Sequence, residues 1–153
     1  MWRLFEHADW ANRRTLEEVQ SLSGSPDPHV LEIFSHVVAS EKVWLARLRG
    51  EPDAAMPLHP RYSLKQCASL IDETGNGYCR YIAPLKDADL QKIVTYRNTR
   101  GIECNMQAKD ILAHVALHSA HHRGQITAAA RKAGSVPIHT DYIAFAREET
   151  RIG

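Results

Sequence analysis

The stretch of residues 107–133 constrains the fold most, because its apolar residues recur with the period of an α-helix. Each residue of a helix turns the chain by about 100°, so residues three and four apart share a face. Gly134 and Pro137 follow the stretch and are typical of a helix end. A helix of this length needs a partner for its apolar face, so the rest of the chain must pack against it.

Other segments of the chain have the same helical period. We expect further helices, in chain order, over residues 2–22, 29–49 and 63–81, with a short last helix at 141–149. Turn formers at 23–28 and prolines within 51–61 separate the first three, and Ser63 with Gln66 forms a capping box. Four main helices with short or moderate loops predict an all-α, antiparallel four-helix bundle.

Residues 91–106 differ from the rest, because β-forming residues lie on both sides of a turn. Ile93 to Tyr96 favour a strand, residues 98–101 can turn, and residues 102–106 can return. We expect a short, hairpin-like excursion before the fourth main helix.

Length and charge limit the classes of protein to which the chain can belong. Its 153 residues are typical of one domain, which we assign to 1–153. The net charge of +1 gives no basic field for nucleic acid or an anionic membrane, and no apolar run could span a bilayer. Three cysteines without a CxxC pair favour a reducing cytoplasm.

Two histidines fall on the apolar face of residues 107–133. His118 and His122 lie within a sector of roughly 80° that contains the apolar residues, whereas Arg123 points away from it. A buried imidazole without a partner costs on the order of 1–3 kcal/mol. A divalent metal ion would satisfy both rings, but hydrogen bonds to the backbone or to carboxylates would also do so. The spacing alone leaves both interpretations open.

The residue next to His118 disfavours one class of metalloenzyme, the zinc proteases. Ser119 follows His118, so the HExxH pattern of zinc proteases, in which a glutamate acts as the general base, is absent. His114 and His121 lie toward the edge of the apolar face and are expected to have structural roles.

A catalytic metal site normally has three protein ligands, so a third ligand must come from elsewhere. Periodicity does not select it, because His36 lies at the flank of the second helix's apolar face and Glu41 lies nearer its centre. The candidates are His7, His29, His36, Glu41 and His59.

Two segments resemble the DinB family. They are HVVASEKVWLARLRG at 36–50 and HVALHSAHHRGQI at 114–126, and the order of elements agrees over nearly the whole chain. The resemblance implies an antiparallel four-helix bundle, often a homodimer, with His36, His118 and His122 around a divalent metal. Nickel, zinc and iron all suit imidazole ligands. The resemblance also suggests that Asn12 reaches the metal pocket, although Asn12 could equally lie on a helix surface.

The same resemblance suggests what such a protein does. Related proteins resemble thiol-dependent transferases that use bacillithiol or mycothiol, so we expect an enzyme that acts on a small-molecule substrate with a low-molecular-weight thiol. Metal-dependent hydrolysis is the alternative chemistry. A non-enzymatic, stress-induced protein with a structural metal is the alternative function. No catalytic residue beyond the metal ligands is predicted.

Overall fold

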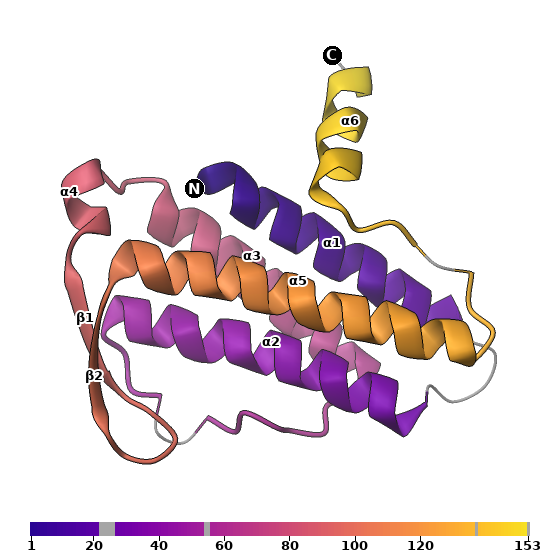
Figure 1. Ribbon diagram of the computed structural model, residues 1–153, viewed down its shortest axis with the longest axis horizontal. Helices are drawn as coiled ribbons and strands as arrows, with labels where there is room; N and C mark the ends of the chain where they lie inside the picture. Colours follow the sequence, from indigo (N-terminus) through magenta and orange to yellow (C-terminus); the bar gives the residue numbers. More distant parts are fainter. Residues whose placement is uncertain (22–26, 54–55, 137, 153) are drawn as a thin grey trace.

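The computed structural model describes residues 1–21, 27–53, 56–136 and 138–152, which are mostly helical with one small two-stranded sheet (Figure 1). Its elements are α1 (Trp2–Ser21), α2 (Pro28–Arg49), α3 (Leu64–Ile82), α4 (Asp87–Leu90), β1 (Ile93–Arg97), β2 (Glu103–Gln107), α5 (Ala108–Lys132) and α6 (Tyr142–Ile152).

The predicted helices and the hairpin are all present. β1 pairs antiparallel with β2, with Ile93 opposite Gln107 and Arg97 opposite Glu103. The short helix α4 was not predicted, and α6 extends a few residues past the predicted end at 149. Three predicted features lie outside the described residues. They are the end of the first helix and most of the first turn, at 22–26, and the helix-stop residue Pro137.

Local hydrogen bonds explain where the helices begin and end. Asp27 caps α2 by accepting a hydrogen bond from the backbone N–H of His29 at 2.8 Å. Ser63 and Gln66 form the predicted capping box at the start of α3. Gly50 ends α2 with a φ of 68°, a left-handed conformation that favours glycine.

The main helices do not alternate in direction along the chain, which corrects the antiparallel arrangement that we expected. Tyr62 donates its backbone N–H to Ser35 near the starts of α3 and α2, and the Tyr78 hydroxyl donates to the Glu41 carbonyl farther along both. Thus α2 and α3 run parallel (Figure 1). The reason is the long connection between the two helices: its described part at 56–63 runs back beside α2, and an extended chain can span about 3.3 Å per residue (Figure 1).

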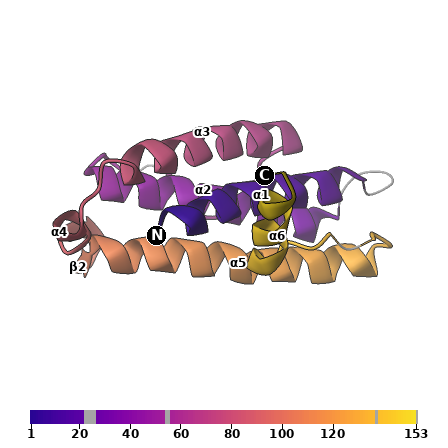
Figure 2. The same cartoon turned by 90° about the horizontal axis from the view of Figure 1, so that it is seen from above.

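The helices α1, α2, α3 and α5 pack against one another, with α1 and α2 between α3 and α5 (Figure 2). Two hydrophobic clusters fill the interior. One joins Phe5 of α1 with Leu48, Tyr78 and Val115, and the other lies around Phe34 near the opposite end. Polar buried residues lie between the two clusters: Asn12, Glu41, Ser119 and Arg123. His118 and His122 also lie between the two clusters along α5, and His36 lies beside them.

Helix α6 lies outside this packing and projects from the side of α1 (Figure 1). The Glu148 carboxylate accepts hydrogen bonds from the Trp10 indole N–H at 3.0 Å and from Arg14 at 2.9 Å. Among the described helices, none combines the length and apolar character needed to cross a bilayer.

Candidate metal centre

Three imidazole rings converge between α2 and α5. The Nε2 atom of His118 lies 3.3 Å from Nε2 of His36 and 3.2 Å from Nε2 of His122. One ring nitrogen of each histidine lies within 4.8 Å of the others, and all three side chains are half-buried. The structure therefore brings together the three residues that the resemblance indicated. We call this group the histidine triad.

The spacing of the three nitrogens fits a shared metal ion. Two imidazole nitrogens bound tetrahedrally at about 2.0–2.1 Å from zinc would be about 3.3–3.4 Å apart. The observed separations of 3.2 and 3.3 Å lie close to this value. The triad can therefore hold an ion with little movement of its side chains.

Hydrogen bonds at the far side of two rings set their tautomers. Nδ1 of His36 donates to the carbonyl oxygen of Leu58 at 2.7 Å, and Nδ1 of His122 donates to Oε1 of Gln125 at 2.7 Å. When Nδ1 carries the proton of a neutral imidazole, Nε2 carries the free lone pair. Both lone pairs thus point at Nε2 of His118, where a cation would relieve their repulsion.

The surroundings lower the pKa values of two of the three rings, those of His36 and His118. Burial, followed by the neighbouring His122 and His36, lowers the pKa of His118 from 6.5 to about 4. Burial is also the largest cause of the lowered pKa of His36. Because protons and metal ions compete for the same lone pair, a lowered pKa leaves the rings of His36 and His118 available at neutral pH.

The other candidate ligands do not belong to the triad. His59 stacks on His36 with ring centroids 4.6 Å apart, and His7 Nε2 meets the carbonyl oxygen of Thr140 at 2.7 Å. His29 lies on the first turn of α2, and Glu41 belongs to the buried polar residues described next.

The two other histidines of α5 also lie outside the triad. His114 packs edge-on against the Trp44 ring, and His121 Nε2 lies 3.3 Å from the amide nitrogen of Gln125. Among the described residues, neither His114 nor His121 belongs to a group that could hold a metal.

A buried polar network lies beside the triad. The Asn12 amide donates to both carboxylate oxygens of Glu41 at 3.0 and 2.9 Å, and the Ser119 hydroxyl donates to Oε1 at 2.7 Å. Arg123 donates to Oδ1 of Asn12 at 3.0 Å. Burial raises the pKa of Glu41 and lowers that of Arg123, each partly offset by the other's charge. Asn12 thus bridges two opposite charges inside the protein.

This network corrects the predicted orientation of α5. Arg123 was expected to point away from the core, yet only 2% of it is exposed, and Ser119 is buried beside it. The buried face is therefore centred on Ser119 and Arg123, with His118 and His122 at its edge. The apolar pattern missed this because the centre of the face is polar.

Comparison with known proteins decides the family. The DinB family model matches residues 1–152. The chain belongs to the DinB family. It is 27% identical over 155 residues to the DinB protein of Bacillus subtilis strain 168, covering 92% of this chain and 90% of that protein.

Two further relatives agree. The uncharacterized B. subtilis protein YizA is 22% identical to this DinB-family chain over 135 residues, covering 88% of this chain and 83% of YizA. A crystal structure of a DinB-like protein from Bacillus cereus matches with a TM-score of 0.62 and 21% identity over 88% of this chain and 91% of that one. The latter match shows a shared fold.

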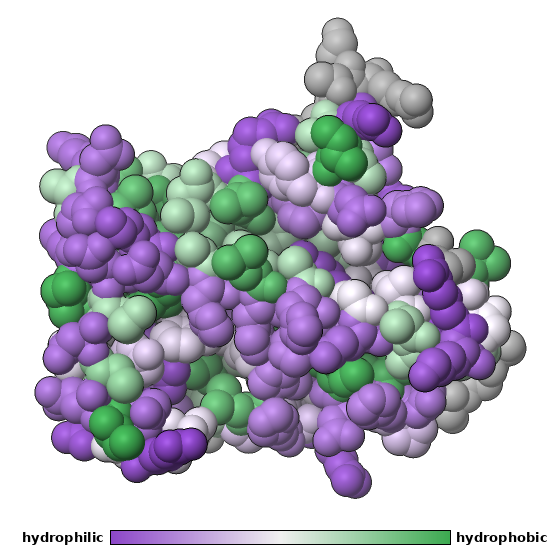
Figure 3. All heavy atoms as spheres, in the orientation of Figure 1, coloured by the Kyte–Doolittle hydropathy of each residue, from purple (hydrophilic) through white to green (hydrophobic). Residues whose placement is uncertain are grey.

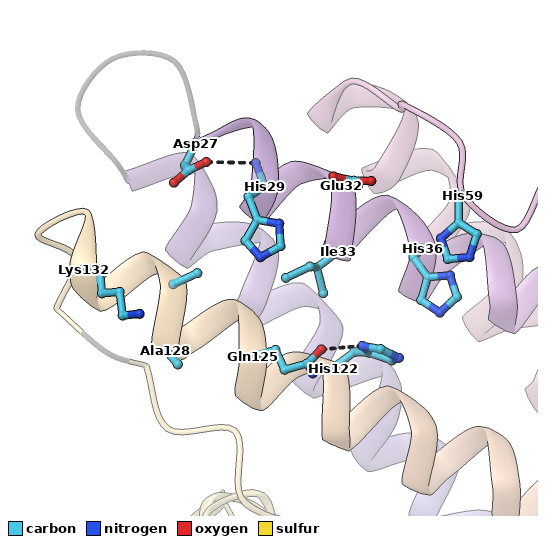
Figure 4. A pocket seen from close by; sticks show the side chains of 11 residues that line it. Asp27, His29, Glu32, Ile33, His36, His59, His122, Gln125, Ala128 and Lys132 are labelled. Atoms are coloured by element: carbon cyan, nitrogen blue, oxygen red, sulfur yellow. Dashed lines mark hydrogen bonds between the residues drawn. The ribbon is translucent and has the colours of Figure 1, made fainter.

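Two cavities flank the triad of this DinB-family chain. A groove of about 550 Å³ includes His36 and His122 in its lining and continues between the first half of α2 and the last half of α5 (Figure 4). An open pocket of about 220 Å³ includes His36 and His118 in its lining, together with Tyr96 and residues 98–99 of the hairpin. Small molecules can therefore reach the triad.

Proposed function

We propose that this DinB-family chain binds one divalent metal ion through His36, His118 and His122 and acts as a metal-dependent enzyme on small molecules. The observation that carries the proposal is the convergence of three Nε2 atoms at the spacing of metal ligands, beside cavities open to solutes. Three protein ligands leave a further coordination position, as in catalytic zinc sites.

We favour transfer of a low-molecular-weight thiol over hydrolysis. A bound ion would supply a Lewis acid that lowers the pKa of a thiol or a water molecule. Hydrolysis also needs a general base within hydrogen-bond reach. The buried carboxylate nearest in the fold, Glu41, is held by Asn12 and Ser119, whereas a thiolate needs no such base.

The transfer would be a substitution. The thiolate sulfur donates an electron pair to a carbon of the electrophile and a sulfur–carbon bond forms. The bond to the leaving group breaks, and the leaving group departs with its electron pair. The thiol proton passes to solvent. The part of the protein in this step is to position the sulfur beside the electrophile, which the triad and its two cavities support.

A structural metal in a stress-induced protein is the competing proposal. A structural zinc site is normally closed by four protein ligands. Among the described residues, only three side chains form the group that could hold the ion, which favours the open site. Nickel, zinc and iron remain the candidate ions, since each accepts imidazole ligands.

Metal analysis tests the metal site. Protein purified without added metal is expected to carry about one divalent ion per chain, in line with three-histidine sites. The matched variants are His118→Ala, which should lose the ion, and His121→Ala, which should keep it. Equal metal contents in these two variants would refute the site.

A thiol screen tests the enzymatic proposal. Low-molecular-weight thiols are mixed with electrophiles and the metal-loaded protein, and the products are analysed by mass spectrometry. We expect a conjugate that forms with metal-loaded protein and is absent with His118→Ala. Conjugates from no thiol, together with a tightly retained metal, would support the structural role instead.

We also propose that α1, α2, α3 and α5 act as a four-helix bundle that pairs with a second copy. Hydrophobic side chains lie among the polar ones on the face shown in Figure 3. The exposed large hydrophobic residues include Trp2, Leu4, Leu117, Tyr142 and Ile143. Light scattering is expected to give the mass of a dimer, and a monomer at all concentrations would contradict this.

A further inference from the structure

The two cavities meet at the triad from opposite directions along the seam between α2 and α5. His122 lines only the groove, His118 lines only the pocket, and His36 lines both. We propose that they bind two different reactants: an elongated molecule with a charged far end in the groove, and a small, planar, uncharged molecule in the pocket. This inference rests on the proposed function and gives the substrate class for each side.

The groove has the length and the walls for an elongated ligand. A rise of about 1.5 Å per residue places Lys132 roughly 15 Å beyond His122 along α5. Ile33 on α2 and Ala128 on α5 line the stretch between (Figure 4). The middle of the ligand is therefore expected to contact apolar side chains. The groove's volume of about 550 Å³ lies within the range of typical small-molecule sites.

Charges of both signs lie along the groove. Asp27 and Lys132 line its far end, and Glu32 lies one helical turn before His36. Asp27 already caps α2, but among the described residues neither Glu32 nor Lys132 belongs to an ion pair. Glu32 and Lys132 are therefore available for a ligand that carries both an amino and a carboxylate group.

The pocket has the opposite character. Its wall contains Trp44 and Tyr96, whose rings meet edge-on with centroids 5.1 Å apart. Arg47 lies 4.6 Å from the centroid of each ring, but Asp53 neutralises its charge in an ion pair at 2.5 Å. Aromatic walls without a free charge, with the Ser40 and Thr99 side chains beside them, fit a small planar group that accepts hydrogen bonds.

The ring of His36 forms the boundary between the two cavities. The Leu58 carbonyl holds one edge of this ring, and His59 stacks on its face at an interplanar angle of 7°. Because the ring is held in this way, a ligand on either side contacts the triad without entering the other cavity. Two separate binding sites at one metal centre suit the transfer of a group between two molecules better than a reaction of a single substrate.

Nuclear magnetic resonance on the zinc-loaded protein can locate each ligand. The probes are glutathione, an elongated thiol with charged arms, and benzamide, a small uncharged aromatic amide. Glutathione is expected to shift the backbone amide signals of Glu32, Ile33 and Ala128. Benzamide is expected to shift the indole N–H signal of Trp44, whereas the Trp2 and Trp10 indole signals serve as internal controls.

Two variants fill one cavity each, and each has a matched control. Ala128→Phe should raise the dissociation constant of glutathione by roughly tenfold and leave that of benzamide unchanged, whereas Thr99→Phe should do the reverse. The controls are Ala120→Phe and Arg100→Phe, which change exposed neighbours that do not line the cavities.

The results separate this inference from the proposed function. Both probes shifting the same signals, both variants weakening the same probe, or no shift with either probe would overturn the two-sided site. Zinc content is measured on the same samples. Loss of zinc from the wild-type protein would instead refute the metal centre itself.

Discussion

Replacing Glu41 by glutamine is expected to destabilise the protein by about 3–5 kcal/mol, the usual cost of breaking a buried charge pair. The carboxylate is fully buried and accepts three hydrogen bonds, two from the Asn12 amide and one from the Ser119 hydroxyl. A glutamine has one oxygen and would turn its own N–H groups toward one of these donors. It would also remove the negative charge that compensates Arg123, which is 2% exposed.

Urea unfolding of metal-free protein, followed by circular dichroism at neutral pH, measures this cost. Because small domains usually have 5–15 kcal/mol of stability, the variant should unfold at a much lower urea concentration than the wild-type protein. The matched control is Glu73→Gln, which removes only the exposed ion pair with Lys42 and should cost less than about 1 kcal/mol.

A double-mutant cycle identifies the cause. Arg123→Met in the Glu41→Gln background should cost at least about 1 kcal/mol less than Arg123→Met alone, because the two charges no longer depend on each other. A loss below about 1 kcal/mol for Glu41→Gln, or strictly additive effects, would refute the reasoning that the two buried charges are coupled through Asn12.

The remaining predictions concern metal, pH and a helix start. Chelation of wild-type protein should lower its melting temperature, whereas His118→Ala should melt at one temperature with or without chelator. The free energy of unfolding of metal-free protein should fall by about 1–2 kcal/mol as the pH falls from 6.5 to about 4. The reason is that the pKa of half-exposed His118 is lowered in the folded protein, so the unfolded chain takes up its proton first. Urea midpoints that do not change with pH would contradict this. Ser63→Ala should cost about 1 kcal/mol by removing the side-chain cap of α3, as measured by thermal unfolding, and an unchanged melting temperature would contradict this.

The positions of the helices could be predicted because they depend on local features. The apolar period, the Ser63–Gln66 capping box and Gly50 all act within a few residues, and the observed ends of α2, α3 and α5 lie within one residue of the predicted ones. The hairpin was predictable for the same reason, since β-forming residues flank a turn.

The direction of α3 and the face of α5 could not be predicted in this way. Whether residues 50–63 turn back or run along α2 depends on tertiary packing, which periodicity does not contain. Arg123 is buried because Glu41 and Asn12 come from two other helices to meet it. One sequence pattern would have indicated that Arg123 is buried: a polar residue at the centre of an apolar face, together with an acidic residue on the apolar face of another helix.

The triad was only partly predictable. The one-turn spacing placed His118 and His122 together, but periodicity put His36 at the flank of its helix. The family resemblance selected His36, and the structure brings its Nε2 to 3.3 Å from that of His118. A residue at the edge of a buried face lies between core and solvent, which is where a ligand must lie if small molecules are to reach the ion.

The two hydrogen bonds that orient the triad should leave different traces in evolution. His122 depends on the side chain of Gln125, so few other residues can replace that glutamine. The hydrogen bond from His36 goes to the carbonyl oxygen of Leu58, which any amino acid supplies. This hydrogen bond therefore does not restrict the amino acid at position 58, provided that the path of the backbone is kept. A comparison of relatives that counts conserved side chains would record one of these supports and overlook the other.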